Sequence, residues 1–365
     1  MPFSDIYKGK TVLVTGHTGF KGGWLTLWLK NLGANVIGLS LEPQNEYNFF
    51  NSTNLKKIID DRRIDIKNLQ SLNNIINSIQ PDFVFHLAAQ ALVRKSYLNP
   101  IETWQTNLLG TVNVLESLKN IRKKSACVLI TSDKCYKNKE WVWGYREDDQ
   151  LGGADPYSAS KAAAELAINS YIKSFFGKGK PYIRISSARA GNVIGGGDWS
   201  KDRIVPDCVK AWSKGDLVKL RSPNSTRPWQ HVLEPISGYL ELGNHLYKDE
   251  LFHGESFNFG PKSSDNYSVE KLVQKMSFYW DKVLWENSSD KDQPYESGLL
   301  KLNCDKALLK MKWESNLSFE DTLRFTIEWY KNFYDFKDCM REKSIDQINE
   351  YCKIAKKSSI SWANS

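Results

Sequence analysis

The chain has 365 residues, carries a formal net charge of +8 and is 41% hydrophobic, so it can bury a large core in two domains or in one domain with an appended lobe. Basic and acidic residues are mixed, and basic clusters stay as short as the run from Arg122 to Lys124. We therefore expect no nucleic-acid partner, while the positive balance suits an enzyme whose ligands carry diphosphates.

Cysteine spacing and hydropathy argue against two further classes. The sequence has no Cys-x-x-Cys pair and no cysteine–histidine cluster with metal-ligand spacing, so we expect no metal and reduced thiols in a cytoplasmic protein. No apolar stretch approaches the ~20 residues that span a bilayer, and no long apolar region precedes the first strand, so we expect neither membrane anchor nor signal peptide. The six cysteines are Cys127, Cys135, Cys208, Cys304, Cys339 and Cys352.

The first half of the chain alternates predicted strands and helices. Short apolar runs rich in β-branched residues predict buried parallel strands, and apolar residues at helical spacing predict the helices between them. This alternation predicts an α/β fold, a Rossmann-type doubly wound parallel sheet, over residues 1–188. The predicted strands are Thr11–Thr15, 36–41, 82–87, 127–131 and 183–188, and the main helices are 22–32, 107–121 and 157–175.

After about Arg189 the alternation weakens, and glycine, proline and tryptophan become frequent. Residues 195–199 and 222–229 have the composition of loops. We predict a smaller α/β substrate-binding lobe over 189–341, with a return of the chain to the first domain near 229–250. The polar stretch 342–365 is expected to be a peripheral C-terminal tail.

The loop after the first strand predicts a dinucleotide site. Its glycines are spaced Gly-x-x-Gly-x-x-Gly, which permits a tight turn, close approach of backbone to a pyrophosphate, and close packing of helix on sheet. Two polar side chains in the loop are candidates for contact with adenosine phosphates or ribose. The predicted cofactor residues of this loop are Gly16, His17, Gly19, Phe20, Lys21 and Gly22.

Later segments extend this cofactor site. The second strand ends in Gly-Leu-Ser-Leu at 38–41 with Glu42 as the nearest acid, so the choice between NAD and NADP stays open, with NAD expected first. Asp65 is placed to accept a hydrogen bond from an adenine amino group, and small residues after the 82–87 strand allow a cofactor to lie against backbone. The further predicted cofactor residues are Asp65, Ile66, Leu87, Ala88, Ala89 and Asn107.

Two short motifs carry the predicted chemistry. Ser132-Asp133-Lys134 follows an apolar strand, and Tyr157 and Lys161 stand one turn apart on a predicted helix, where positions i and i+4 share a face. A phenol has a pKa near ~10, and a nearby cation favours its phenolate. The pair predicts a base that can take a proton from a sugar hydroxyl.

Together these segments resemble the extended short-chain dehydrogenase/reductases that act on nucleotide sugars. Within that group, the chain resembles the CDP-glucose 4,6-dehydratase family in the strings HTGFKGGWL, QALVRKSY, TSDKCYKNKEWVWGYRE, RAGNVIGGGDWSKDR and RPWQHVLEP. The resemblance covers about residues 8–332. It implies conversion of CDP-glucose to CDP-4-dehydro-6-deoxyglucose and water in deoxysugar biosynthesis, such as that of lipopolysaccharide O-antigen.

The resemblance also implies a role for each catalytic residue. Tyr157 removes the proton of the C4 hydroxyl, Lys161 favours the phenolate and holds the nicotinamide ribose, and Ser132 binds the C4 oxygen. Asp133 protonates the leaving C6 hydroxyl. Lys134 is expected to be the neutral amine that removes the C5 proton; the alternative is an ion pair with Asp133 that only orients the acid.

Substrate binding and assembly follow from the same resemblance. Guanidinium groups suit bidentate contact with a diphosphate, and the helices 107–121 and 157–175 imply a homodimer. Two alternatives remain open: a nucleotide-sugar 4-epimerase or reductase, and a non-catalytic dinucleotide-binding protein. The predicted substrate residues are Arg94, Asn192, Arg203, Arg227 and His231.

Overall fold

The computed structural model describes residues 2–177, 182–220, 222–262, 265–281, 283–288, 299–336 and 340–364, so Cys339 lies outside the described residues. The five described cysteines are free thiols. In this part of the chain no helix is both long and apolar enough to cross a membrane.

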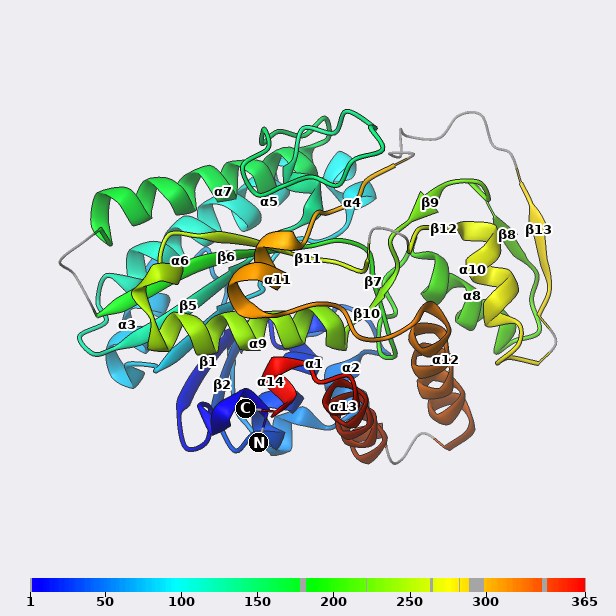
Figure 1. Cartoon of the computed structure of the whole chain (residues 1–365), viewed down its shortest axis with the longest axis horizontal. Helices are drawn as coiled ribbons and strands as arrows, with labels where there is room; N and C mark the ends of the chain where they lie inside the picture. The colour runs from blue at the N-terminus through cyan, green and yellow to red at the C-terminus, as the bar shows by residue number, and fades with distance from the viewer. Residues whose placement is uncertain are drawn as a thin grey trace.

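A seven-stranded parallel sheet forms the centre of the molecule, in the order β11-β6-β5-β4-β1-β2-β3 (Figure 1). The chain adds strands on one side of β1 up to β3 and then on the other side from β4 onward, so the topological switch point of the doubly wound fold lies between β1 and β4. The predicted fold class is confirmed. The strands are β1 (Thr11–Thr15), β2 (Asn35–Ser40), β3 (Asp60–Arg63), β4 (Phe83–His86), β5 (Ser125–Ile130), β6 (Ile183–Ala190) and β11 (Ser256–Phe259).

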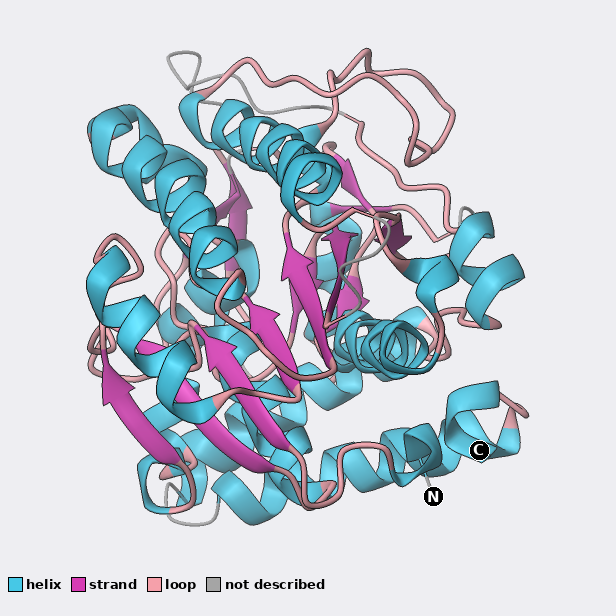
Figure 2. Ribbon diagram, turned by 90° about the vertical axis from the view of Figure 1, so that its left-hand side faces the viewer, coloured by secondary structure: helices cyan, strands magenta, loops and turns pink. Residues whose placement is uncertain are grey.

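Helices cover both faces of the sheet (Figure 2). Alternate residues of one strand enter opposite cores: Val12 and Val14 of β1 join the larger core, whereas Leu13 joins the smaller. The smaller core lies under α3, α6 and α7, and the larger lies under α1 and α9. These helices are α1 (Phe20–Asn31), α3 (Leu69–Ile79), α6 (Gly110–Leu118), α7 (Pro156–Phe175) and α9 (Leu233–Lys248).

Short elements bridge the larger ones in the first domain. Asp155 caps the first turn of α7 by accepting from Ser158 N–H, and Pro156 occupies a position where no amide donor is needed. The short elements are η1 (Pro2–Asp5), α2 (Phe49–Ser52), η2 (Leu55–Lys57), α4 (Val93–Leu98), α5 (Pro100–Trp104), the π-helical turn η3 (Gln105–Leu109) and η4 (Asp133–Cys135).

A smaller lobe stands beyond the carboxyl end of the sheet, on the right of Figure 1. Three two-stranded sheets hold it together: β7 with β10, β8 with β13, and β9 with β12. Its elements are β7 (Val193–Ile194), α8 (Ile204–Trp212), β8 (Val218–Leu220), β9 (Thr226–Arg227), β10 (Gln230–His231), β12 (Tyr267–Ser268), α10 (Val269–Met276), β13 (Trp285–Asn287) and α12 (Phe319–Phe336).

The segment 189–341 is not wholly in this lobe. The chain returns to the sheet through α9, and the return runs beyond residue 250, because η5 (Glu250–Phe252) leads into the edge strand β11. Helix α11 (Asp305–Met311) also packs against β11 (Figure 1).

The stretch 342–365, predicted as a peripheral tail, lies in two packed helices. Helices α13 (Met340–Lys357) and α14 (Ser361–Asn364) pack on the first domain beside the N-terminus (Figure 1). Trp362 is fully buried and stacks on Phe3 with ring centroids 4.9 Å apart, and Tyr351 meets Trp28 edge-on. A few large aromatic residues on an otherwise polar helix supply enough apolar area to dock it.

Candidate active site

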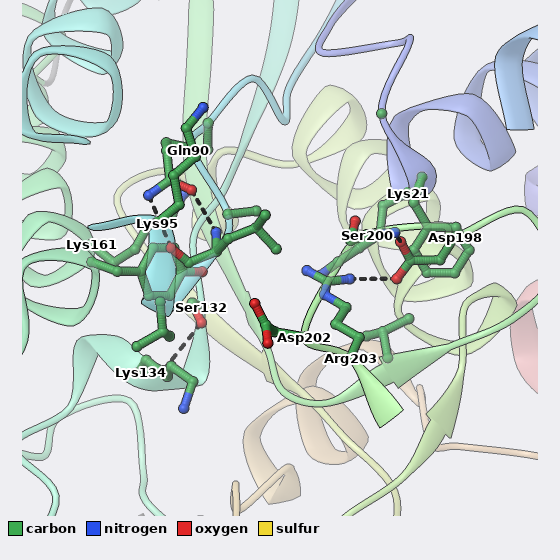
Figure 3. Close-up of a pocket in the computed structure, with 18 of the residues that line it drawn as sticks. Lys21, Gln90, Lys95, Ser132, Lys134, Lys161, Asp198, Ser200, Asp202 and Arg203 are labelled. Atoms are coloured by element: carbon green, nitrogen blue, oxygen red, sulfur yellow. Dashed lines mark hydrogen bonds and ion pairs between the residues drawn. The ribbon is translucent and has the colours of Figure 1, made fainter. Parts of the chain in front are cut away.

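One cavity of about 1590 Å³ lies at the carboxyl ends of the strands and continues into the smaller lobe. The loops that follow β1 to β6 all contribute to its wall, as expected for a parallel sheet. Figure 3 shows two polar groups facing each other across it, with Ser132, Lys134 and Lys161 on one side and Asp198 and Arg203 on the other.

The glycine loop presents bare backbone to the cavity. Gly16 has a φ of +78°, and a Cβ there would lie 2.6 Å from the backbone nitrogen of Ala88. A Cβ on Gly22 would lie 2.0 Å from the carbonyl oxygen of Gly16. Only glycine fits at either position, and the first turn of α1 directs its free amides toward this loop. The cradle therefore fits the pyrophosphate of a dinucleotide.

His17 lies beneath the cavity rather than in its wall. The imidazole is fully buried, its Nε2 is 2.8 Å from Asp61 Oδ1, and a Cβ on Gly38 would lie within 2.4 Å of the ring. Burial lowers the pKa of His17, against the opposing effect of Asp61. The expected contact of His17 with a cofactor is thus not supported, because its side chain supports the loop from below and packs on β2.

At the end of β2, where an acid usually binds the adenosine ribose, the cavity wall carries the hydroxyl groups of Ser40 and of the neighbouring Thr18. Thr18 Oγ1 and Ser40 Oγ are 2.6 Å apart, and both residues line the cavity. The nearest acid, Glu42, pairs with Arg63 at 2.8 Å. Asp65 also lines the cavity, and its carboxylate accepts the Lys67 N–H at 2.9 Å.

Asn107 does not reach the cavity wall. Its side chain accepts the Gln90 N–H at 2.8 Å and donates to the Gln90 carbonyl at 3.0 Å and to Ser160 Oγ at 2.9 Å. It therefore ties the loop after β4 to α7, and a direct contact with a cofactor is not supported. The predicted cofactor residues that line the cavity are Gly16, Gly19, Phe20, Lys21, Gly22, Asp65, Ile66, Leu87, Ala88, Ala89, Tyr157 and Lys161.

The catalytic candidates come together where β5 ends against the first turns of α7. Ser132 Oγ donates to Asp133 Oδ1 at 2.9 Å. Burial raises the pKa of the Tyr157 phenol to about 12, although a hydrogen bond with Ser132 lowers it. The expected depression of this pKa is absent from the protein alone, because desolvation outweighs the Ser132 hydrogen bond and the charge of Arg203.

The two lysines differ in burial. Burial lowers the pKa of Lys161 to about 8, and the carboxylate of Glu165 opposes that shift. Lys134 is half-buried and lines the cavity, and its backbone N–H donates to Ser132 Oγ at 3.2 Å. Its amine points away from Ser132 and Lys161 in Figure 3. Among the described residues no ion pair joins Lys134 to Asp133, so the orienting ion pair does not form in this structure.

The smaller lobe contributes cationic side chains held by carboxylates. Arg203 Nη1 is 2.7 Å from Asp198 Oδ2, and Arg94 Nη1, from α4, is 3.3 Å from Asp202 Oδ1. Arg227 also lines the cavity, and it donates to the Thr226 carbonyl at 2.8 Å. The predicted substrate residues that line the cavity are Arg94, Asn192, Arg203 and Arg227.

His231 is not one of them. It is fully buried between the rings of Trp24 and Phe325, and burial lowers its pKa to about 3. A neutral imidazole in an aromatic core cannot bind a diphosphate, so the expected substrate contact is not supported.

Two carboxylates of this region were not predicted. Asp198 is buried in the cavity wall, and its position after three glycines of the loop 195–197 was the available signal. Glu165 is buried on α7, and its place one turn after Lys161 was the signal for it. Among the described residues, no group of three or more metal-ligating side chains could hold a metal ion.

The protein-family comparison decides the relationship. The model described as GDP-mannose 4,6 dehydratase matches residues 13–326, a range that contains every residue of the cavity wall. The chain belongs to the GDP-mannose 4,6 dehydratase family.

Curated relatives place the chain within this dehydratase family. It is 44% identical to a CDP-glucose 4,6-dehydratase of Salmonella typhimurium, over 92% of this chain and 94% of the relative. It is 25% identical to a dTDP-glucose 4,6-dehydratase of Haemophilus influenzae, over 87% of this chain and 97% of the relative. A UDP-glucose 4-epimerase of Mycoplasma genitalium is 24% identical over 89% and 97%. The identity with the Salmonella protein is thus far higher than with these two relatives.

Solved structures share the fold of this dehydratase family. An epimerase of Methanothermobacter thermautotrophicus superposes with a TM-score of 0.78 at 24% identity, over 92% of this chain and 96% of the other. A UDP-glucose 4-epimerase of Stenotrophomonas maltophila, with bound NAD and formylated UDP-arabinopyranose, gives 0.76 at 17% identity, over 89% and 98%. The Rossmann-type architecture is common to all three.

Proposed function

We propose that the protein is a CDP-glucose 4,6-dehydratase that converts CDP-glucose to CDP-4-dehydro-6-deoxyglucose and water. The observation that carries the proposal is the meeting of Ser132, Asp133 and Lys134 with Tyr157 and Lys161 in one cavity, in a chain 44% identical to the Salmonella enzyme. A 4-epimerase or reductase needs the tyrosine and lysine but not a second acid–base pair.

We infer that the cofactor is NAD. The bare backbone of the glycine loop fits a dinucleotide, and a structural neighbour contains NAD. Bound NAD supplies a hydride acceptor for C4, a hydride donor for C6, and a positive charge near the phenol.

Oxidation at C4 uses the residues around Tyr157. The Tyr157 phenolate takes the hydroxyl proton while C4 loses hydride, so charge does not build up on the sugar oxygen. Ser132 donates to that oxygen as it becomes a carbonyl. Lys161, one turn along α7, favours the anionic phenol and holds the nicotinamide ribose.

Loss of water uses the loop after β5. The C4 carbonyl acidifies the C5 proton, which the Lys134 amine removes. Asp133 protonates the C6 hydroxyl, the C6–O bond breaks and water leaves. Hydride returns to C6 and a proton to C5, so the sugar keeps its oxidation balance.

Substrate holding depends on cationic side chains of both domains. Arg94, Arg203 and Arg227 line the cavity beyond the catalytic residues, together with Asn192. Guanidinium groups in this part of the cavity suit the diphosphate of a nucleotide sugar.

A homodimer is supported by exposed apolar side chains at the first domain's surface. Leu98 of α4 is 81% exposed, Ile101 of α5 is 72% exposed, and Leu109 of η3 and Leu166 of α7 are also exposed. Such a group on adjoining helices suits burial against a second copy. We place the enzyme in the cytoplasm, in deoxysugar biosynthesis such as that of O-antigen, a placement supported by its free thiols.

The test is incubation of the purified protein with CDP-, UDP-, dTDP- or GDP-glucose, with and without added NAD. The readout is the absorbance that alkali induces in a 4-keto-6-deoxy sugar. Product from CDP-glucose and from none of the other three is expected. A 4-epimer without loss of water, or no product from any of the four, would overturn the proposal.

A further inference from the structure

A third residue shares the catalytic face of α7. Glu165 follows Lys161 by one turn and Tyr157 by two turns, so the three side chains stand in one row along the helix. Glu165 does not line the cavity and is 3% exposed. A charged side chain this deeply buried needs partners, and it has several.

Its carboxylate is bound by three donors, two on β6 and one directly after β5. Arg189 Nη2, on β6, lies 2.7 Å from Glu165 Oε2, and Ser187 Oγ donates to the same oxygen at 2.9 Å. The Thr131 hydroxyl donates to Oε1. Thr131 immediately precedes Ser132, so Glu165 connects α7 directly to the loop that carries the other catalytic group.

Arg189 extends this connection beyond the loop. Its Nη1 donates to Tyr136 Oη at 2.7 Å and to the Glu147 carbonyl at 2.8 Å. These two residues belong to the segment that follows Ser132, Asp133 and Lys134. The ion pair therefore fixes the position of α7 relative to the whole segment after β5.

Glu165 is also the anion beside Lys161. Burial raises the pKa of Glu165, but Arg189 and the hydroxyl donors outweigh it, so the net pKa is lowered and the carboxylate stays charged. Burial lowers the pKa of Lys161 to about 8. Among the neighbouring groups that oppose this shift, the carboxylate of Glu165 has the largest effect.

The other groups that face Lys161 do not replace this anion. Burial lowers the pKa of His86, on β4, to about 3, and burial raises the pKa of the Cys135 thiol, on η4, so both are uncharged near neutral pH. Lys21, on α1, is a second cation, and Tyr157 is a phenol. The carboxylate of Asp133, on η4, raises the pKa of Tyr157 and of Lys21.

We propose that Glu165, through its ion pair with Arg189, is a positioning residue of the reaction that holds Lys161 in its charged form and fixes α7 against the Ser132 loop. This inference rests on the proposed function for its effect on turnover, but the charge of Lys161 is measurable without substrate.

The first experiment is competitive labelling of lysines with acetic anhydride across pH, followed by mass spectrometry of the peptide that contains Lys161. Glu165→Gln keeps the size of the side chain and removes its charge. The midpoint for Lys161 is expected to fall by about one pH unit, because the charged amine loses its neighbouring anion.

The matched control is Glu234→Gln. Glu234 is a buried carboxylate on α9 that is not part of the cavity wall. It accepts the Asn316 N–H at 2.8 Å and the Leu317 N–H at 2.6 Å. The same chemical change there is expected to leave the Lys161 midpoint unchanged. An equal shift in both variants would overturn the proposal, as would no shift in Glu165→Gln.

The second experiment is the pH profile of turnover. Loss of the Lys161 proton ends activity on the alkaline side of the pH profile. In Glu165→Gln that limb is therefore expected to move about one pH unit lower, which reduces turnover at pH 8 about fivefold. Glu165→Asp, which keeps the charge, is expected to restore the limb. A wild type that is inactive on all nucleotide glucoses would defeat the proposed function alone, since the labelling result still decides the role of Glu165.

A folding defect is separated from this role by a double variant. Glu165→Gln with Arg189→Met removes both partners and leaves no unpaired charge in the core, which buried ion pairs often tolerate. It is expected to show a downward shift of the Lys161 midpoint that is smaller than in Glu165→Gln, because the cation is removed together with the nearer anion. A wild-type midpoint in the folded double variant would contradict the proposal.

Discussion

The two halves of the cavity are built in different ways. The cofactor half is made of backbone packed to contact, as at Gly16 and Gly22, where no Cβ fits. The substrate half is made of charged side chains from distant segments, such as the pair Arg94–Asp202, whose members are 29% and 43% exposed. A substitution in the cofactor half clashes with backbone atoms that cannot move away, whereas a substitution in the substrate half contacts side chains that can rearrange.

Tyr157, where the two halves meet, is expected to be the most sensitive position. Tyr157→Phe should reduce hydride transfer by about 10⁴-fold, because the phenol oxygen is the base at C4. Cofactor binding should persist. Stopped-flow absorbance of the reduced nicotinamide measures the step. The control is Tyr239→Phe, whose buried hydroxyl has no hydrogen-bond partner among the described residues, and which should stay active. Near-normal turnover of Tyr157→Phe would remove it as the base.

Lys134 distinguishes dehydration from oxidation. Lys134→Ala should still oxidise C4 but should slow loss of water by about 10³-fold, since the C5 base is gone. Exchange of the C5 proton with deuterated solvent, followed by mass spectrometry, separates the two steps. If dehydration continues unaltered while oxidation is normal, the base is another group.

Gly22 tests the backbone half directly. In Gly22→Ala the new Cβ meets the Gly16 carbonyl oxygen 2.0 Å away, and neither atom belongs to a flexible side chain. Affinity for NAD is expected to fall about 100-fold, as measured by calorimetry. Gly215→Ala is the control: its φ is +77° but nothing lies within 4 Å, so only local strain is added. Equal losses of NAD affinity in Gly22→Ala and Gly215→Ala would show that the cofactor half does not depend on close backbone packing.

Arg227 tests the side-chain half. Arg227→Ala should raise the KM for the nucleotide sugar by roughly 10- to 100-fold through loss of a charged contact, and should leave NAD affinity unchanged. The exposed Arg122→Ala, away from the cavity, is the control for net charge. An unchanged KM would refute the phosphate contact.

Asp202 is expected to matter least. Its ion pair with Arg94 is partly exposed, and such pairs contribute less than about 1 kcal/mol. Asp202→Asn should therefore change the free energy of unfolding by less than about 1 kcal/mol and the KM by less than about threefold. Denaturant titration and steady-state kinetics measure both. A large loss of stability would mean that the substrate half is as rigid as the cofactor half.

This contrast also explains what could be predicted from sequence. The first strand was predicted with its observed bounds, Thr11–Thr15, and the glycine loop was placed correctly, because both follow from local spacing. The placement of His17 and His231 in the site was not borne out by the structure, because burial depends on packing that one sequence does not display. The same holds for Trp362, whose burial docks a tail that composition marks as polar.

The ion pairs were beyond sequence for a related reason. Glu165 and Arg189 stand on a helix and a strand 24 positions apart, and nothing in their spacing joins them. The pairing becomes visible only once the sheet order places β6 beside β5. Residues that act through contacts between elements therefore need the fold before they can be recognised.

The most direct test of the account is the fate of hydrogen at C4. CDP-glucose labelled with deuterium at C4 should give a 4-keto-6-deoxy product that has lost one water and carries the deuterium at C6, because one cavity performs oxidation, dehydration and reduction in sequence. Mass spectrometry and proton NMR locate the label. A 4-keto-6-deoxy product without deuterium at C6 would contradict the internal hydride transfer on which the proposed function depends.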